Sequence, residues 1–172
     1  MRRRLAPATC SDLRQSVERG QQRLAYLFAV EDHAGVIAEA RRCRAAMHLC
    51  AEFAEQDADR HIGCAAHVIV METRAHVALA TRADQPLEAL LHIDAGLRDL
   101  LDYFAARANV RAYDRAREVR ALEHLRDRML EEIFPGPRAE LRRALAEALR
   151  EERYEDAARL RDHLRARRLR PQ

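Results

Sequence analysis

Apolar residues recur along most of the chain at three- and four-residue intervals, the spacing that places side chains on one face of an α-helix. Ser11 is placed to cap a first helix, which carries the apolar positions Leu13, Val17, Leu24, Leu27 and Phe28. Asp32 precedes a second helix, whose apolar stripe is Val36, Ile37, Ala40, Cys43, Met47, Cys50 and Phe53. The polar run 55–60 ends it, so this part of the chain predicts two amphipathic helices.

Three further helices are predicted before residue 135. The third runs from Ile62 to Ala80, and its consecutive apolar centre, Val68 to Met71, is typical of a helix covered on more than one side. Pro86 suits the first position of a fourth helix, with an expected core stripe of Leu87, Leu90, Leu91, Leu97, Leu100, Leu101 and Phe104. Asn109 interrupts the chain before a fifth helix, with an apolar seam at Tyr113, Ala116, Val119, Leu122, Leu125, Met129 and Ile133. No segment alternates as a strand does, which predicts an all-α fold.

The strongest break in the helical pattern is Pro135-Gly136-Pro137. Two prolines with fixed φ angles around a permissive glycine cannot continue a helix. We therefore expect three parts: a basic tail over 1–10, a helical domain over 11–134, and a two-helix hairpin over 138–170.

Three stretches, which begin at Glu31, Ala83 and Glu152, each place a short polar turn ahead of a helix start rich in small residues. Their spacing is unequal, so a strict repeat is not shown. The two predicted N-terminal pairs of helices nevertheless resemble tetratricopeptide hairpins, and Thr81 to Leu97 is the best match. The fold expected for residues 11–134 is a tetratricopeptide-like bundle or short solenoid of antiparallel hairpins.

Composition and charge narrow the class of protein. A chain of 172 residues can bury a real core, and 48% hydrophobic content with only 5% aromatic residues suits helices. The net charge of +3 is concentrated after residue 137, where eleven arginines face seven acids. No run approaches the ~18 apolar residues of a membrane helix, and Met1–Pro7 lacks the apolar run of a secretion signal. We expect a cytoplasmic protein without a membrane partner.

The C-terminal segment carries the most specific pattern. After Leu141, Leu145 and Ala148 comes an acidic turn, followed by an aromatic residue, an acid, two alanines, Leu-Arg-Asp and an aliphatic residue: Tyr154, Glu155, Ala157, Ala158, Leu160, Arg161, Asp162 and Leu164. This pattern resembles the UVR motif, named from the excinuclease subunits UvrB and UvrC, and it covers about a fifth of the chain. Two helices this short cannot bury their apolar faces alone, so they must dock on residues 1–133 or on another hairpin.

The UVR resemblance implies a protein-contact role and no chemistry. In the excinuclease the hairpin joins subunits, and similar hairpins occur in an adaptor that activates a protein arginine kinase and in certain Clp ATPases. This chain lacks nuclease, helicase and ATPase motifs, and it lacks the CxxC pairs of the zinc-bearing adaptor. We predict a non-catalytic adaptor that binds a protein partner or a second copy of itself through Leu141, Leu145, Tyr154, Ala157, Ala158, Leu160, Arg161 and Leu164.

Two other classes of function stay open on sequence. The arginines from Arg165 to Arg170 could bind phosphates in a DNA-repair or nucleic-acid accessory protein, although no aromatic residue interleaves them. A thiol or metal sensor could use the sulfur and imidazole groups of Cys43, His48, Cys50, His61, Cys64, His67 and His76. Their long spacings favour buried thiols and partly exposed imidazoles instead. We therefore expect no metal, no cofactor and no catalytic residue.

Overall fold

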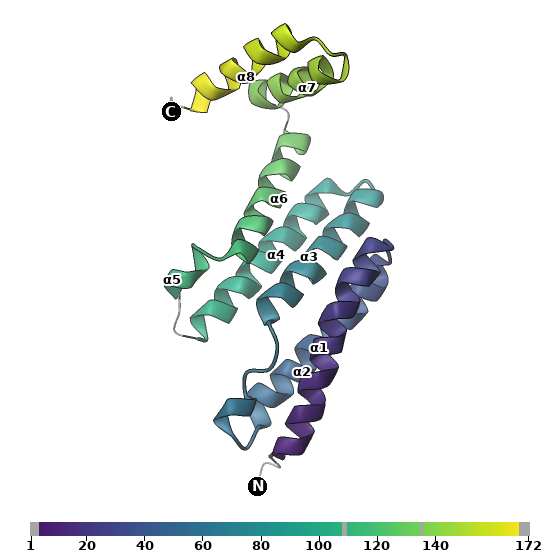
Figure 1. Ribbon diagram of the computed structural model, residues 1–172, viewed down its shortest axis with the longest axis vertical. Coiled ribbons are helices and arrows are strands. Elements are labelled where there is room, and N and C mark those ends of the chain that lie inside the picture. Colours follow the sequence, from purple (N-terminus) through teal and green to yellow (C-terminus); the bar gives the residue numbers. More distant parts are fainter. Residues whose placement is uncertain (1–3, 108–109, 135, 169–172) are drawn as a thin grey trace. The chain divides into compact units, whose positions relative to one another are not determined.

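The structure is a computed structural model that describes residues 4–107, 110–134 and 136–168 (Figure 1). Its helices are α1 Pro7–Ala29, α2 His33–Phe53, α3 Ala65–Arg82, α4 Pro86–Ala105, α5 Val110–Tyr113, α6 Arg117–Ile133, α7 Pro137–Arg150 and α8 Tyr154–Arg168, with a 3-10 turn, η1, at Asp57–Asp59. The described residues contain no strand, which confirms the all-α prediction and its helical hairpins.

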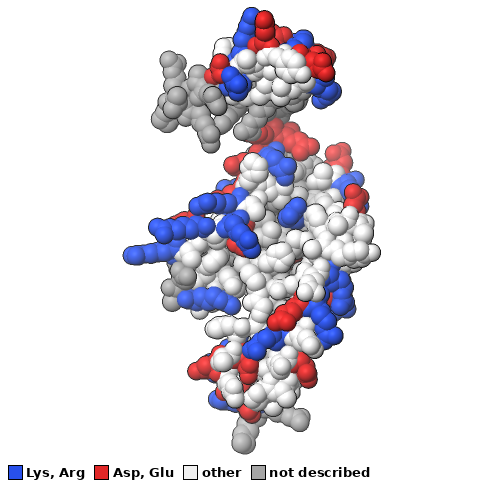
Figure 2. All heavy atoms as spheres, in the orientation of Figure 1, with Lys and Arg blue, Asp and Glu red and all other residues white. Residues whose placement is uncertain are grey.

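The chain forms two compact units, Met1–Arg126 and Asp127–Gln172. The division falls within α6, ahead of the boundary that Pro135-Gly136-Pro137 predicts, and Pro135 itself lies outside the described residues. Within the described residues, no helix combines the length and the apolar character needed to span a bilayer. Acidic and basic side chains are interspersed over the face shown in Figure 2.

The first helix begins earlier than the pattern predicted. Pro7 occupies the first turn of α1, where its missing N–H costs nothing, so the helix starts four residues before Ser11. Leu5 lies in extended backbone beside the end of α2, where its N–H donates to the Phe53 carbonyl at 2.7 Å and its carbonyl accepts from Glu55 at 3.2 Å. Cys10 is fully buried. Residues 5–10 are therefore part of the helical unit and not of a basic tail.

The core of the first unit lies between α1, α2 and α3, and α3 also packs against α4. All four consecutive apolar residues from Val68 to Met71 are buried, as predicted for a helix covered on several sides. The α2 stripe is also confirmed, because every predicted member except the half-buried Phe53 is buried. Asp32 caps this helix as its Oδ1 accepts from the Gly35 N–H at 2.9 Å.

A buried charge lies between α1 and α2. Glu39 is 4% exposed and forms ion pairs with Arg42 and, at 3.5 Å, with Arg23. Gly20 makes room for it, since a Cβ at this position would lie 2.5 Å from Cys43 Sγ and 2.8 Å from Glu39 Oε1. The glycine therefore sets how closely the two helices approach.

The expected stripe of α4 was wrong at three positions. Leu87 and Leu91 are 63% and 68% exposed, and Leu101 is also exposed. The predicted Leu97 and Leu100 are buried, and the rest of the buried face consists of Ala89, Ile93 and Gly96. A Cβ at Gly96 would lie 2.2 Å from Thr73 Oγ1 and 3.1 Å from Leu122 Cδ1, so the neighbouring side chains leave no room for a side chain here.

The predicted fifth helix is divided into α5 and α6. A tight turn separates them, in which Arg115 donates to the Ala112 carbonyl at 3.2 Å and Ala116 donates to Tyr113 at 3.0 Å. The Tyr113 ring packs edge-on against Phe104, 6.1 Å between centroids. This packing draws the residues before Asp114 toward the end of α4, and Asn109 lies outside the described residues.

The three sequence stretches noted above share one turn conformation. Glu31, Asp84 and Glu152 have φ values of 59°, 56° and 58°, in the left-handed region that a non-glycine residue seldom adopts. In each turn the next residue donates to a carbonyl five positions back: Asp32 to Leu27 at 2.9 Å, Gln85 to Ala80 at 2.9 Å, and Arg153 to Ala148 at 2.8 Å. This is the Schellman ending of a helix, built three times without glycine.

Two stacked imidazoles join α3 to α4. The rings of His76 and His92 are 4.5 Å apart between centroids and 19° from parallel. Burial and then the charge on His92 lower the pKa of His76, with Arg41 acting in the same direction and Glu72 and Glu88 opposing them. Protonation of His76 is therefore disfavoured in the folded protein.

Candidate functional site

The C-terminal hairpin consists of α7 and α8, joined through residues 151–153. Pro137 begins α7 without a side-chain cap, and Arg150 lies in its last turn. Glu155 and Asp156 lie in the first turn of α8, where their charges favour the exposed N–H groups. The linking turn is thus defined by local sequence at both helix ends.

Arg153 holds the turn in place. Its Nη2 lies 2.7 Å from Glu151 Oε2, and its Nη1 lies 3.0 Å from Asp156 Oδ2. The hydrogen bond to Glu151, followed by that to Asp156, raises the pKa of Arg153. These side chains are solvent-exposed, so the pairs orient the turn more than they stabilise it.

The hairpin buries little apolar surface. Among the side chains described in α7 and α8, only Ala148 and Ala157 are buried. Tyr154 is 66% exposed and Leu149 is 52% exposed. The remaining predicted apolar contacts are half-buried, namely Leu141, Leu145, Ala158, Leu160 and Leu164. The small residues thus set the close helix contact, and the leucines are left incompletely covered.

Arg161 differs from the other predicted site residues because it is exposed and pairs with its neighbour Asp162 at 3.2 Å. A shallow pocket of about 270 Å³ lies along α7 and α8, lined by Ala144, Glu147, Arg153, Asp156, Arg159, Leu160 and His163. Of these, the sequence pattern predicted only Leu160 as a contact residue. The other lining residues are mostly polar and were not predicted as contacts, because only the packing of α7 against α8 brings them together.

The candidate metal and thiol residues do not form a site within the described part of the chain. Cys10, Cys43 and Cys50 are buried, whereas Cys64 is exposed. Burial and a hydrogen bond with Cys10 raise the pKa of Cys50 to about 11, so this thiol stays protonated at neutral pH. No group of three His, Cys, Asp or Glu side chains among the described residues could hold a metal ion.

Comparison with known proteins adds no relative to this geometry. No family model, no curated protein and no solved structure matches the chain. The resemblances to the UVR motif and to tetratricopeptide hairpins therefore stay predictions, and the case for a function rests on the residues themselves.

Proposed function

We propose that this chain is a non-catalytic adaptor that binds a protein partner through the leucine face of α7 and α8. The observation that carries the proposal is the incomplete burial of Leu141, Leu145, Leu160 and Leu164 in a hairpin whose buried side chains, among those the structure describes, are two alanines. The resemblance of this segment to the UVR motif points in the same direction.

The energetics favour a partner. Complete burial of one leucine is worth about 1.5–3 kcal/mol, and this gain is only partly realised in the hairpin. A surface that covers several such leucines at once would bind through the hydrophobic effect. Tyr154 at the start of α8 has an exposed side chain, and tyrosine is among the residues that most often dominate binding energy at interfaces.

The test is Leu160→Asp in the full-length chain, because an aspartate buried at the interface would be an unpaired charge. Leu87→Asp is the matched control, since it makes the same change at an exposed leucine of α4. Self-association is measured by light scattering, and a partner is captured from lysate and then re-bound as a purified protein. We expect Leu160→Asp to weaken the association at least about tenfold, or ~1.4 kcal/mol, and Leu87→Asp to leave it unchanged.

The fold of the Leu160→Asp variant is the second part of the test. Leu160→Asp should leave the helical spectrum and the unfolding of the first unit unchanged. If it instead lowers the stability of the whole chain while association persists, the hairpin is a structural element and the adaptor function is wrong.

A nucleic-acid accessory function depends on the arginines between Arg165 and Arg170, whose side chains lie outside the described residues. Its signature would be duplex binding that weakens steeply with salt, because each phosphate contact releases counterions. Salt-independent association through the leucine face distinguishes the adaptor from this alternative.

A further inference from the structure

A basic surface lies on the first unit between the end of α4 and the start of α6. Residues 105–120, the arginine segment, contain five arginines and two acids, which give this stretch alone a net charge of +3. The whole chain carries the same +3, so the remainder is neutral in sum. The arginines are Arg107, Arg111, Arg115, Arg117 and Arg120, and the acids are Asp114 and Glu118. Figure 2 shows basic side chains projecting at the left edge of the molecule, at the height of α5 and the start of α6 in Figure 1.

Most of this charge is not neutralised by an acid. Arg117 pairs with Glu118 at 2.9 Å. Among the described residues, no carboxylate forms an ion pair with the other four, which are the exposed side chains of Arg107, Arg111, Arg115 and Arg120. The three arginines of α2, in contrast, all form ion pairs with glutamates. The arginine segment therefore presents positive charge that the fold itself does not use.

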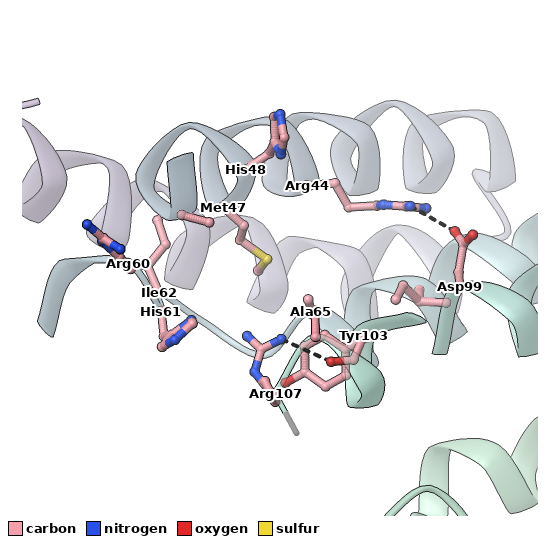
Figure 3. A pocket seen from close by; sticks show the side chains of 13 residues that line it. Arg44, Met47, His48, Arg60, His61, Ile62, Ala65, Asp99, Tyr103 and Arg107 are labelled. Carbon is pink, nitrogen blue, oxygen red and sulfur yellow. Dashed lines mark hydrogen bonds and ion pairs between the residues drawn. The ribbon is translucent and has the colours of Figure 1, made fainter. Parts of the chain in front are cut away.

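Aromatic rings lie among the unpaired arginines. The guanidinium carbon of Arg107 lies 3.8 Å from the centroid of the Tyr103 ring, and the same group donates to the Tyr103 carbonyl at 3.4 Å (Figure 3). The Phe104 ring lies edge-on to Tyr103 at 5.2 Å between centroids and to Tyr113 at 6.1 Å. All three rings are half-buried, whereas Arg107 is exposed. Flat aromatic and guanidinium groups thus occur beside the positive charge.

A shallow hollow of about 480 Å³ brings one of these rings together with two unpaired arginines. It is lined by Phe104, Arg111, Ala112, Arg115, Ala116 and Glu118. Its acid is already paired with Arg117, so the positive charge of the lining is in excess. At ~30 Å³ for each water-sized group, the volume accommodates roughly 16 non-hydrogen atoms, more than one nucleotide base contains.

We propose that the arginine segment binds single-stranded nucleic acid, with one base in the hollow against Phe104 and the neighbouring phosphates on Arg111 and Arg115. Arginines neutralise phosphates, and aromatic and guanidinium groups stack on unpaired bases, whose faces a duplex keeps covered. An acidic protein would engage the charge and leave the rings unused. This surface is separate from the leucine face of α7 and α8 and from the arginines after residue 164.

The probe is a fluorescein-labelled oligothymidylate of about 12 nucleotides, within the site sizes of single-strand binders. Its binding to the full-length chain is followed by fluorescence anisotropy at increasing salt. Four phosphate contacts should make the affinity fall with salt with a logarithmic slope near −3, at about 0.7 for each contact. A strand of abasic sites, a duplex of the same length and polyglutamate should each bind at least about fivefold more weakly, because none offers an unpaired base.

The variant is the double substitution Arg111→Gln with Arg115→Gln, which removes two exposed, unpaired charges and should leave the helical spectrum unchanged. We expect it to weaken oligothymidylate binding at least about tenfold at low salt and to flatten the salt slope by about 1.4. The matched control is Arg19→Gln with Arg74→Gln, which makes the same change of charge on α1 and α3. Arg74 also lies over a ring, 4.6 Å from the Phe28 centroid, so this control reproduces an arginine–aromatic contact outside the arginine segment.

Three results would overturn the proposal. Polyglutamate or the abasic strand binding as tightly as oligothymidylate would show a surface for acidic chains in general. Equal effects of the two double variants would show a response to net charge alone. Oligothymidylate binding that the Arg111 and Arg115 substitutions leave unchanged would place the contact elsewhere on the chain.

Discussion

The substitution Gly96→Ala tests whether one missing side chain sets the packing of α4. The new Cβ would lie 2.2 Å from Thr73 Oγ1, 2.9 Å from Thr73 Cγ2 and 3.1 Å from Leu122 Cδ1. Neither neighbour can move freely, because Thr73 is buried in α3 and Leu122 is fully buried in α6. The helices would therefore have to separate at Gly96 to admit the methyl group.

The magnitude follows from two opposing effects. Overpacking of a close-packed core costs about 1–3 kcal/mol. Replacing glycine by alanine within a helix returns up to about 1 kcal/mol. We therefore expect Gly96→Ala to lower the free energy of unfolding by about 1–2 kcal/mol, which for a chain of this size lowers Tm by roughly 2–8 °C.

Urea unfolding followed by ellipticity at 222 nm measures this change. The matched background is Thr73→Ala, which removes both of the closest atoms. In that background the same glycine substitution should cost at least 1 kcal/mol less, a coupling of the size expected between residues in contact. A Gly96→Ala protein as stable as the parent, or a loss of stability that Thr73→Ala leaves unchanged, would refute the steric explanation.

Three further predictions follow from the turns, the imidazole pair and the thiols. Glu152→Gly should stabilise the α7–α8 hairpin by about 0.5–1 kcal/mol, because glycine adopts the left-handed conformation without strain, and amide hydrogen exchange in α8 would show the slower opening. The free energy of unfolding should fall as the pH drops below ~6.5, because His76 takes up a proton in the unfolded chain before it does so in the folded chain, where its pKa is lowered. His92→Gln removes one cause of the lowered pKa, so urea unfolding at pH 7 and 5.5 should show a smaller loss of stability for this variant. Under native conditions one thiol, Cys64, should react rapidly with a disulfide reagent and the buried Cys10, Cys43 and Cys50 slowly, whereas equal rates for all four would contradict their burial.

Local sequence signals determined most helix positions in this protein. Asp32 caps α2, Pro86 begins α4, and the consecutive apolar centre of α3 lies buried as expected. Caps and proline succeed as signals because they act on the backbone within a few residues, and a continuous apolar run succeeds because its side chains favour burial on every side of the helix. The turn before α8 was likewise evident, and its residues 151–153 lie where the acidic run placed them.

Contacts between distant residues escaped prediction from sequence. The backbone of Leu5 forms hydrogen bonds with the end of α2, so residues 5–10, which were expected to be a basic tail, belong to the first unit. The hollow lined by Met47, Ile62, Ile69 and Tyr103 likewise joins residues from four segments that share no periodicity. Hydrogen bonds and cavities of this kind depend on how elements meet, which no local window contains.

The fourth helix shows most directly what the sequence alone determined and what tertiary structure decided. Its apolar spacing correctly predicted a helix, yet it assigned Leu87 and Leu91 to the core, where the structure places Ala89 and Gly96 instead. An apolar stripe is assigned from the positions of large apolar side chains, because their burial contributes the most free energy per residue. Which face is buried depends on the closest distance between helix axes, and small residues set that distance. The sequence thus specified that α4 is a helix with Leu97 and Leu100 on its buried face, while the packing against Thr73 and Leu122 decided that Gly96 also lies on that face.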